Sequence, residues 1–367
     1  MALEVDILGM ASPFNIFGIG SKSKNYLGID IGTLSIKIVE LSNENGRPKL
    51  ENYAILTNYG LALRNLVQDD AKKTLKVFDG EASPMLRRLI KAGEIEAREI
   101  NMSVPIFSSF LTVMELPQMS ESEVASAIQF EAKKYVPVPL DSVVIDWSLI
   151  GTSGDGKILI LLVAIPKDLI NEYTNIARET GLKLLTIELE TVSAARALVG
   201  NDPVPAVLMD MGSRDTTISV VDSGSLRISH SIETSGEDLT RVLANGLNIN
   251  WRRAEELKKE NGLKIMDNNS QITSVLTPLL DVIIKAAQNI IDIYFSKTKK
   301  KIEKLIIYGG ASKMPGFTEY LNNRLKMDVV IGAPFSRVVY PEKLKPVINE
   351  IGHEFTIAIG LALKALQ

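Results

Sequence analysis

Apolar and polar residues alternate at the start of the chain with the period of β-strands. From Tyr26 the sequence reads YLGIDIGTLSIKIVELSNENGRPKLENYAIL, which predicts two apolar strands around a turn and then a third strand. Asn45-Gly46 is a strong hairpin signal, because both residues tolerate the positive φ of a tight turn. Residues 83–98 then predict a helix and a loop, and residues 99–104 a further strand.

Residues 106–190 have a different pattern, in which strands and helices follow one another closely. The order is a strand (FLTVMELP), a helix, a PVP break, two strands around a GDG turn (VVIDWSLIG and KILILLVAIP) and a helix (KDLINEYTNIARETG). Ser120 and Glu123 have the spacing of a capping box, in which two side chains bind the free N–H groups at a helix start. The pattern predicts a compact inserted α+β module.

The opening pattern then returns in the second half of the chain. AVLMDMGSRDTTISVVDSGSLRISHSI again gives three strands with an Asp-x-Gly turn, and Asp210 stands 180 positions after Asp30. Recurrence at half the chain length predicts two similar lobes. Residues 237–296 are helical in pattern with a polar loop at 266–271, and a strand (KLIIYGG), a helix (PGFTEYLNNRLKM) and a last helix at 355–366 follow.

Composition excludes several classes of protein. The chain has 367 residues, which exceeds the usual size of one hydrophobic core. Its net charge of −3 argues against a nucleic-acid partner. It contains no cysteine and only two histidines, His230 and His353, so thiol chemistry is excluded and a histidine-rich metal site is disfavoured. Any chemistry must therefore depend on carboxylates, hydroxyls, lysines and backbone amides.

Targeting signals are not evident in the pattern. The longest uninterrupted apolar run, Ile158–Pro166, is about half the length needed to cross a bilayer. Residues 1–25 show no sustained period, and their apolar part contains Glu4 and Asp6, which argues against a secretory signal. We therefore expect a tail at 1–25 and a cytoplasmic protein without a membrane span.

The first candidate site is the turn in LGIDIGTLSIK. A glycine there lets backbone amides approach phosphate oxygens closely, two hydroxyls and an ammonium add donors, and an aspartate can hold the water shell of Mg²⁺. The residues in question are Asp30, Gly32, Thr33, Ser35 and Lys37. Taken alone, this pattern also fits an ordinary hairpin whose aspartate caps the turn.

Two further segments strengthen the phosphate interpretation. A second Asp-x-Gly turn could clamp a triphosphate from the opposite side, and its candidates are Asp210, Gly212, Ser213, Arg214 and Thr216. A strand that ends in Gly-Gly before a helix would let a purine and its ribose lie on the backbone. That segment is LIIYGGASKMPG, with Gly309, Gly310, Ala311 and Met314.

The order of these three motifs resembles the actin-like ATPase superfamily, which includes actin, the hexokinases and the heat-shock cognate chaperones. The resemblance implies that the Asp-x-Gly turns are phosphate loops, that Gly309–Met314 is the adenosine loop, and that ATP binds with Mg²⁺ near Asp30 and Asp210. It also implies that Glu190, at the start of the first connecting helix (ETVSAARALVG), positions the attacking water. A helix-start carboxylate favoured by the helix dipole explains Glu190 equally well.

The same resemblance extends to a ribose-contacting helix and to the inserted module. Glu255 and Lys258 in AEELK match the ribose helix, although charged helix faces are usually only solvated. The module resembles the extra subdomain of the FtsA/PilM branch, and its EAKKYVP…DW segment is most similar to the PilM family. The chain ends at its final helix, without the membrane-targeting helix of FtsA, and this also favours the PilM family.

The resemblance implies an α/β fold: a two-lobed actin-like ATPase of duplicated RNase H-like lobes with an inserted α+β subdomain. The expected divisions are a tail (1–25), a first lobe (26–105), the insert (106–186), a connecting helix (187–200), a second lobe (201–352, with a helical part at 237–296) and a C-terminal connecting helix (353–367).

The implied role is an ATP-binding, cytoplasmic part of the type IV pilus machinery at the inner membrane. It would bind the cytoplasmic N-terminal peptide of PilN, link it to the motor ATPases, hydrolyse ATP slowly at most and meet the membrane only through partners. A homo-oligomer, an FtsA-like filament-forming ATPase and a small-molecule kinase of the same fold stay open as alternatives.

Overall fold

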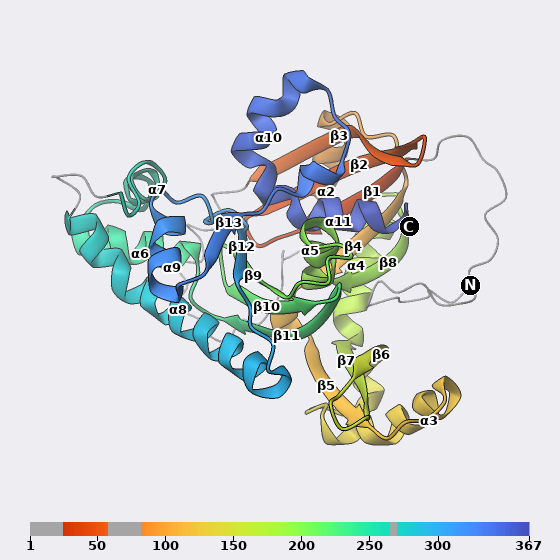
Figure 1. Cartoon of the computed structure of the whole chain (residues 1–367). Coiled ribbons are helices and arrows are strands. Elements are labelled where there is room, and N and C mark those ends of the chain that lie inside the picture. The colour runs from red at the N-terminus through yellow and green to blue at the C-terminus, as the bar shows by residue number, and fades with distance from the viewer. Residues whose placement is uncertain (1–24, 58–81, 265–269, 367) are drawn as a thin grey trace.

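The computed structural model describes residues 25–57, 82–264 and 270–366 of the chain. The expected tail at 1–25 and the expected polar loop at 266–271 fall almost entirely outside these residues. Two mixed sheets, each with its own helices, form the body of the molecule, and a smaller third sheet projects from the first (Figure 1). The expected two-lobed α/β architecture with an inserted subdomain is confirmed.

The first sheet has the strand order β3-β2-β1-β4-β8. Its strands are β1 (Tyr26–Ile31), β2 (Ser35–Glu44), β3 (Arg47–Thr57), β4 (Glu99–Val104) and β8 (Lys183–Leu189). The first three pair antiparallel, while β4 and β8 add in parallel. Asn45 and Gly46 both have positive φ between β2 and β3, so the predicted hairpin is confirmed. Helix α2 (Ala82–Ala92) covers this sheet with its apolar face.

The second sheet repeats this topology as β11-β10-β9-β12-β13. Its strands are β9 (Ala206–Met211), β10 (Thr216–Asp222), β11 (Ser225–Ile232), β12 (Lys304–Tyr308) and β13 (Asp328–Ile331). Its helices are α6 (Gly236–Leu247), α7 (Trp251–Glu260), α8 (Ser270–Thr298) and α9 (Phe317–Leu325). Because both sheets run three antiparallel strands into two parallel ones, the duplication inferred from the Asp-x-Gly spacing is confirmed.

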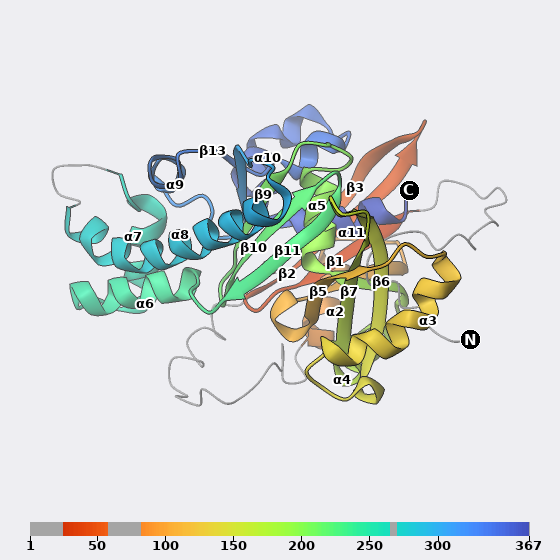
Figure 2. The same ribbon diagram turned by 60° about the horizontal axis from the view of Figure 1, so that its bottom comes forward.

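The inserted module has a three-stranded antiparallel sheet of order β5-β7-β6 (Figure 2). Its elements are β5 (Phe110–Leu116), α3 (Glu121–Glu131), β6 (Val143–Thr152), β7 (Ile158–Pro166) and α4 (Lys167–Glu179). The capping box is present, since Glu123 accepts hydrogen bonds from the N–H and the hydroxyl of Ser120 at 2.7 and 2.8 Å.

The expected end of the insert at residue 186 is wrong. Lys183–Leu189 forms β8, which pairs with β4 in the sheet of the first lobe, so the boundary cuts a strand. Parallel addition of β8 requires a crossover, and α4 supplies it by burying Leu169, Ile170 and Tyr173 in the first-lobe core. The connecting helix expected at 187–200 is correspondingly shorter, because α5 covers Glu190–Leu198.

Two helices cross between the lobes. Helix α5 follows β8 directly, and α11 (Thr356–Lys364) comes near the end of the chain. They meet at Gly360, where a Cβ would lie only 1.9 Å from the carbonyl oxygen of Ser193. On its other side α11 packs against β1 at Gly28, where a Cβ would lie 2.0 Å from the carbonyl oxygen of Ala358. Glycine at these two positions therefore permits backbone-to-backbone packing at the centre of the molecule.

The end of the expected second lobe is also wrong. The segment before α11 consists of η4 (Pro334–Arg337), η5 (Glu342–Leu344), α10 (Lys345–Ile351) and η6 (Gly352–Phe355). It returns to the first lobe, where Val339 exchanges backbone hydrogen bonds with Pro48 and Leu50 next to β3. Phe335 and Phe355 pack there into a separate apolar cluster with side chains of β2 and β3. The second lobe therefore ends near residue 333.

Helix α8 is long and apolar enough, by length and composition, to cross a membrane over Gln271–Thr298. No helix of this kind was expected from uninterrupted apolar runs in the sequence, because polar residues are scattered along α8. Its apolar face packs into the second-lobe core through Leu276, Leu280, Ile283 and Ala287. About 33% of the apolar window is buried in this packing. A helix with such a buried stripe also fits the core of a globular lobe.

Candidate functional site

Both Asp-x-Gly turns open into one cleft of about 360 Å³ between the lobes. The first turn, between β1 and β2, is closed by a hydrogen bond from Gly32 N–H to the Ser35 carbonyl oxygen at 3.0 Å. The second turn, between β9 and β10, is supported from behind by α6, whose Gly236 N–H donates to the Gly212 carbonyl oxygen at 2.9 Å. Two tight turns thus face one space, as the phosphate interpretation requires.

Asp30 and Lys37 form an ion pair at the floor of the first turn. They are register partners on β1 and β2, and Lys37 Nζ lies 3.2 Å from Asp30 Oδ2. Burial by itself would lower the pKa of Lys37, but the carboxylates of Asp30, Glu354 and Asp210 raise it above its usual value. Lys37 is therefore a permanent cation that faces carboxylates of both lobes.

The opposite side of the cleft is acidic. Burial, followed by the charges of Asp215 and Asp30, raises the pKa of Asp210 to about 8. Burial and the neighbouring Asp30 and Asp210 raise the pKa of Glu190 well above its usual value. The pKa of Asp215 is also raised, mainly by burial, although Ser231 and Thr217 donate hydrogen bonds to it. Among the residues that line the cleft, seven acidic side chains stand against four basic ones, Lys37, Arg214, Lys258 and Lys259, so negative charge is in excess.

This imbalance fits a divalent cation. Asp30 is 2% exposed, and its Oδ1 atom has no hydrogen-bond partner among the described residues. Within the described ranges, no three acidic or histidine side chains lie close enough together to ligate one ion. Mg²⁺ commonly keeps several waters and uses one or two carboxylates together with substrate phosphates. Asp30 and Asp210 fit a Mg²⁺ held in this way better than an ion caged by protein alone.

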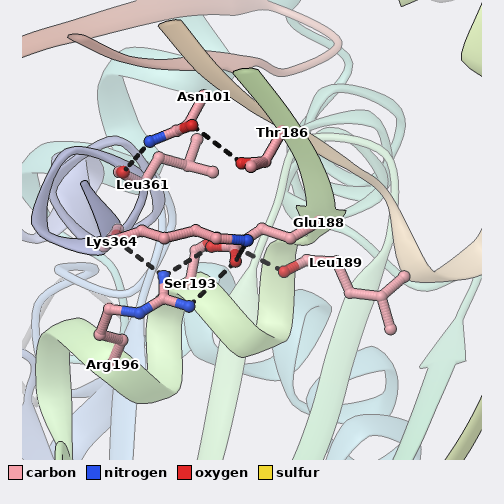
Figure 3. A network of polar contacts seen from close by, with 9 residues as sticks. Asn101, Thr186, Glu188, Leu189, Ser193, Arg196, Leu361 and Lys364 are labelled. Atoms are coloured by element: carbon pink, nitrogen blue, oxygen red, sulfur yellow. Dashed lines mark hydrogen bonds and ion pairs between the residues drawn. The ribbon is translucent and has the colours of Figure 1, made fainter. Parts of the chain in front are cut away.

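Glu188 and Glu190 stand on either side of the change from β8 to α5, and they face different surroundings. Glu190 lines the cleft. Glu188 is fully buried behind it, where Arg196 Nη1 and Nη2 lie 2.6 and 2.9 Å from its carboxylate and Lys364 Nζ lies at 3.2 Å (Figure 3). Burial alone would raise the pKa of Glu188, but these two cations hold it below its usual value. Of the two carboxylates, only Glu190 is placed for chemistry.

The Gly-Gly segment after β12 closes a third side of the cleft. Gly309 has φ of 86°, and a Cβ there would lie 2.2 Å from Asp210 Oδ1. The N–H of Ala311 donates to the Met211 carbonyl oxygen at 3.2 Å, which holds the segment against the second turn. Gly309, Gly310 and Ala311 all line the cleft, so the loop lies where the sequence placed it.

Helices α6 and α7 form the outer wall of the cleft. The ammonium group of Lys258 donates to the Gly236 carbonyl oxygen, to Thr240 and to Glu255 at 2.7–2.8 Å. These three acceptors use all three of its protons, so Lys258 fixes the start of α6 rather than offering a free donor. Glu255 lines the cleft beside Trp251, the first residue of α7.

Two predicted site residues do not reach the cleft. Thr216 is fully buried in β10, and its hydroxyl donates to the Thr234 carbonyl oxygen at 2.6 Å. Met314 is buried in the core of the second lobe. The other predicted residues line the cleft: Asp30, Gly32, Thr33, Ser35, Lys37, Glu190, Asp210, Gly212, Ser213, Arg214, Glu255, Lys258, Gly309, Gly310 and Ala311.

Among the further cleft residues that were not predicted from the sequence are Asp215, Glu237, Trp251 and Glu354. The repeat contained the signal for Asp215, because an offset of 180 places it at the position of Ser35 in the first turn. The same offset places Thr216 at the position of the buried Ile36. No comparable signal marks the other three, since they come from helix starts that only the tertiary fold brings to the cleft.

The duplicated lobes, the crossing helices and the shared cleft define the class of actin-like ATPase folds. Solved structures agree with this. A PilM–PilN type IV pilus biogenesis complex contains a chain that matches with a TM-score of 0.78, at 20% identity over 93% of this chain and 98% of that one. MreB5 of Spiroplasma citri bound to AMPPNP matches with a TM-score of 0.54, at 13% identity over 94% and 96% of the two chains.

The family is decided by sequence. Residues 28–366 match the family model of the type IV pilus assembly protein PilM, and the chain belongs to that family. More distant relatives are the cell division proteins FtsA of Enterococcus faecalis and Bacillus subtilis. The first is 20% identical over 92% of this chain and 87% of its own length, and the second is 22% identical over 84% and 78%. The PilM family and a role in type IV pilus assembly, both inferred from the insert, are confirmed.

Proposed function

We propose that the chain binds ATP with Mg²⁺ in the cleft between its lobes. The observation that carries this proposal is the pair of opposed Asp-x-Gly turns around a buried, unpartnered Asp30 Oδ1. Backbone N–H groups of the turns, the hydroxyls of Thr33 and Ser213 and the ammonium of Lys37 would hold the phosphates. The bound AMPPNP in the similar MreB5 structure supports the same use of this cleft.

The cation would offset the excess of negative charge in the cleft. Asp30 and Asp210 would hold its water shell, and the raised pKa of Asp210 would fall once it binds. The purine would lie along Gly309 and Gly310, where the absence of side chains leaves the backbone open. Trp251 and Glu255 would then border the ribose and base from α7.

Hydrolysis, if the chain performs it, depends on Glu190. Burial raises the pKa of this carboxyl, which favours its protonated form, and a protonated carboxyl cannot accept a proton from water. We therefore propose slow hydrolysis at most. Glu190→Gln should leave the affinity for Mg-ATP within about three-fold of the native value and lower steady-state phosphate release at least ten-fold, because one general base contributes about 10²–10⁴-fold to a rate.

Glu237→Gln is the matched control, since Glu237 also lines the cleft but lies at the start of α6. It should change phosphate release much less than the substitution at residue 190. Equal release by the native protein and the Glu190 variant would show that another group positions the water.

We propose further that the insert and the adjoining first lobe bind the cytoplasmic N-terminal peptide of a PilN-like membrane protein. The similar PilM–PilN complex supports this partner. The protein would then act at the cytoplasmic face of the inner membrane, where it could link that peptide to the motor ATPases. Nucleotide binding would set the angle between the lobes and thereby the state of the peptide platform.

The contacts of the insert support such coupling. The insert is built into the first lobe, yet it also contacts β11, the edge strand of the second lobe. Arg227 on β11 donates to the carbonyl oxygen of Ile150 on β6, at an irregularity in the β6–β7 register. Its other terminal nitrogen donates to the Asp222 carbonyl oxygen at 3.2 Å. A change in lobe angle would therefore pull on the edge of the insert.

Calorimetry tests both parts of the proposal. The full chain is titrated with Mg-ATP and then with a peptide copying the cytoplasmic N-terminus of the PilN-like protein from the same genome. Both should bind, and saturating Mg-ATP should change the peptide affinity by about five-fold or more, the usual size of coupling between two sites. A scrambled peptide is the control. If Mg-ATP binds but the peptide does not, the proposal of a nucleotide site stands and the proposal of a peptide platform is wrong.

An FtsA-like filament former is the second candidate, favoured by the matches to FtsA over most of the chain. Sedimentation with Mg-ATP and with Mg-ADP separates the two roles. A large nucleotide-dependent pellet without peptide would favour the filament.

A further inference from the structure

Six exposed lysines lie along one edge of the second lobe, at the point where α8 and α9 end and β12 and β13 begin. They are Lys297, Lys299, Lys300, Lys301, Lys304 and Lys326, and we call them the lysine edge. Residues 304 and 328 are register partners, so the two helix ends lie next to one another. The exposed acidic residues beside them are Asp292, Glu303 and Asp328. A strong local excess of positive charge thus stands on a protein whose net charge is −3.

Two of these lysines have an unfavourable backbone conformation. Lys299 follows α8 with φ of 59°, and Lys326 follows α9 with φ of 56°. Glycine or asparagine is the stable choice at such left-handed helix ends. The helix dipole favours cations at a helix C-terminus, which accounts for Lys297, but at the two left-handed positions a lysine keeps a backbone strain that glycine would avoid. Local stability therefore does not explain the lysine edge.

The edge is anchored by one of its members. Lys300 Nζ and Tyr294 Oη both contact Asp222 Oδ2 at 2.8 Å, which fixes the turn after α8. Lys301 lies 3.7 Å from Glu303. Lys297, Lys299, Lys304 and Lys326 form no ion pair with any residue in the described ranges. Their ammonium groups are therefore free to meet anions outside the chain.

Apolar side chains stand beside these charges. Phe295 is 49% exposed and Ile293 44% exposed on the last turns of α8. The N–H of Lys299 donates to the Phe295 carbonyl oxygen at 2.8 Å, so the backbone of Lys299 directly follows the helical turn that carries Phe295. An exposed phenyl ring next to lysines suits the boundary between lipid headgroups and acyl chains.

The position of the edge agrees with such a surface. The carboxyl end of α8 and the insert with β5 and α3 both lie at the lower side of the molecule in Figure 1. A protein that holds a membrane-anchored peptide through its insert would therefore bring the lysine edge toward the same bilayer.

We propose that the lysine edge binds the anionic lipid surface of the membrane directly, with Phe295 entering the headgroup layer. This goes beyond the proposed function, because it adds a contact made by the chain itself to the contact made through the peptide. It differs from the sequence-based expectation that membrane association depends on partners alone. Lipid is favoured over an acidic protein by the exposed phenyl ring and by the side of the molecule on which the edge lies.

Vesicle sedimentation of the full chain without peptide is the test. We expect binding to vesicles of phosphatidylglycerol and phosphatidylcholine, little binding to pure phosphatidylcholine, and loss of binding as salt is raised. Replacing Lys297, Lys299, Lys304 and Lys326 by Gln should weaken the binding at least 50-fold, since each lysine near an anionic surface contributes about five-fold. Phe295→Ser should weaken it without changing its salt dependence.

The matched control is the pair Lys343→Gln and Lys345→Gln. These lysines are exposed near the start of α10, on the upper side in Figure 1. They should change vesicle binding less than three-fold. Equal losses in the two sets would mean that net charge alone drives the binding, and this would overturn the proposal. Absence of vesicle binding by the native chain would also overturn it and would point to an acidic protein as the occupant.

A second set of variants separates strain from function. Lys299→Gly and Lys326→Gly should raise the melting temperature and weaken vesicle binding together. Glu94→Gly, at another left-handed position with φ of 51° after α2, should raise the melting temperature and leave binding unchanged. Peptide affinity should stay constant in all these variants, so failure of the lipid site is distinguishable from failure of the peptide platform.

Discussion

Replacing Asp210 by Asn should abolish Mg-ATP binding and, without metal or nucleotide, make the protein more stable at pH 8.5. Asp210 is the last residue but one of β9, next to the second turn, and it lies against Gly309 among the cleft carboxylates. The amide of Asn has the same shape as the carboxylate of Asp210, but it lacks the negative charge that would hold the metal's water shell. We expect a loss of affinity of about 10- to 100-fold or more, since an interaction with a charged group contributes about 1.5–3 kcal/mol.

The stability gain follows from the pKa of the native residue. Burial and its acidic neighbours raise the pKa of Asp210 to about 8 in the folded protein, against about 3.9 in the unfolded chain. Between these values the folded state binds more protons, so the free energy of unfolding falls as pH rises from 4 to 8. Asn does not titrate and avoids this loss. Because each pH unit between the two pKa values changes the free energy of unfolding by about 1.4 kcal/mol, we expect a gain of several kcal/mol, at most about 5, at pH 8.5 and none near pH 4.

Urea unfolding at several pH values in a chelating buffer measures the gain, and calorimetry measures the affinity. Asp222→Asn is the control, because Asp222 is a buried aspartate on the neighbouring strand with an opposite environment. Burial would raise its pKa, but hydrogen bonds from Lys300 and Tyr294 hold that pKa below its usual value. This variant should lose stability at neutral pH and bind Mg-ATP normally. Normal Mg-ATP affinity in the Asp210 variant would refute the metal site.

Much of the fold could be predicted because its signals are local. The Asn45-Gly46 turn, the capping box at Ser120 and the strand alternation each depend on neighbours along the chain. The duplication was predicted from the 180-residue offset between Asp30 and Asp210. The same offset placed both Asp-x-Gly turns at the same point of two equivalent sheets. The glycines of the three loops followed, since turns and close backbone approach require residues without side chains.

The parts that could not be predicted depend on contacts between distant segments. Nothing in the pattern of 334–351 indicates that it returns to β3, because Val339 meets Pro48 and Leu50 only in the folded chain. The alternation of side chains along a strand did indicate that only one of Asp215 and Thr216 can face the cleft, since neighbouring residues on a strand face opposite sides. Lys258 shows the remaining limit: its charge suggested a ligand contact, while its three acceptors come largely from α6.

The second large effect is expected at Gly360, where Ala should destabilise the protein severely. A Cβ there would lie 1.9 Å from the carbonyl oxygen and 2.5 Å from the carbonyl carbon of Ser193, both in the backbone of α5. No rotamer change can relieve a backbone clash, so α5 and α11 must move apart by more than 1 Å. Separation would open the packed centre between the lobes.

The same movement would disturb the buried network behind the cleft. Arg196 donates to the Gly360 carbonyl oxygen at 2.9 Å and forms an ion pair with Glu188. Lys364 forms a second ion pair with Glu188 (Figure 3). Breaking a buried ion pair is strongly destabilising, because a charge without its partner remains out of water. Together with the clash we expect a loss of about 3–5 kcal/mol in the free energy of unfolding.

Thermal and urea unfolding of Gly360→Ala measure this loss. Gly154→Ala is the control, because a Cβ at Gly154 meets no atom within 4 Å, and its melting temperature should stay within about 2 °C of the native value. If Gly360→Ala is too unstable to purify, Glu188→Gln tests the network without a clash and should lower stability by a smaller amount. Because Glu188 lies just before α5, which begins at Glu190, the Glu188→Gln variant should also bind Mg-ATP more weakly. A Gly360→Ala protein as stable as the Gly154 variant would mean that the two helices do not pack backbone to backbone.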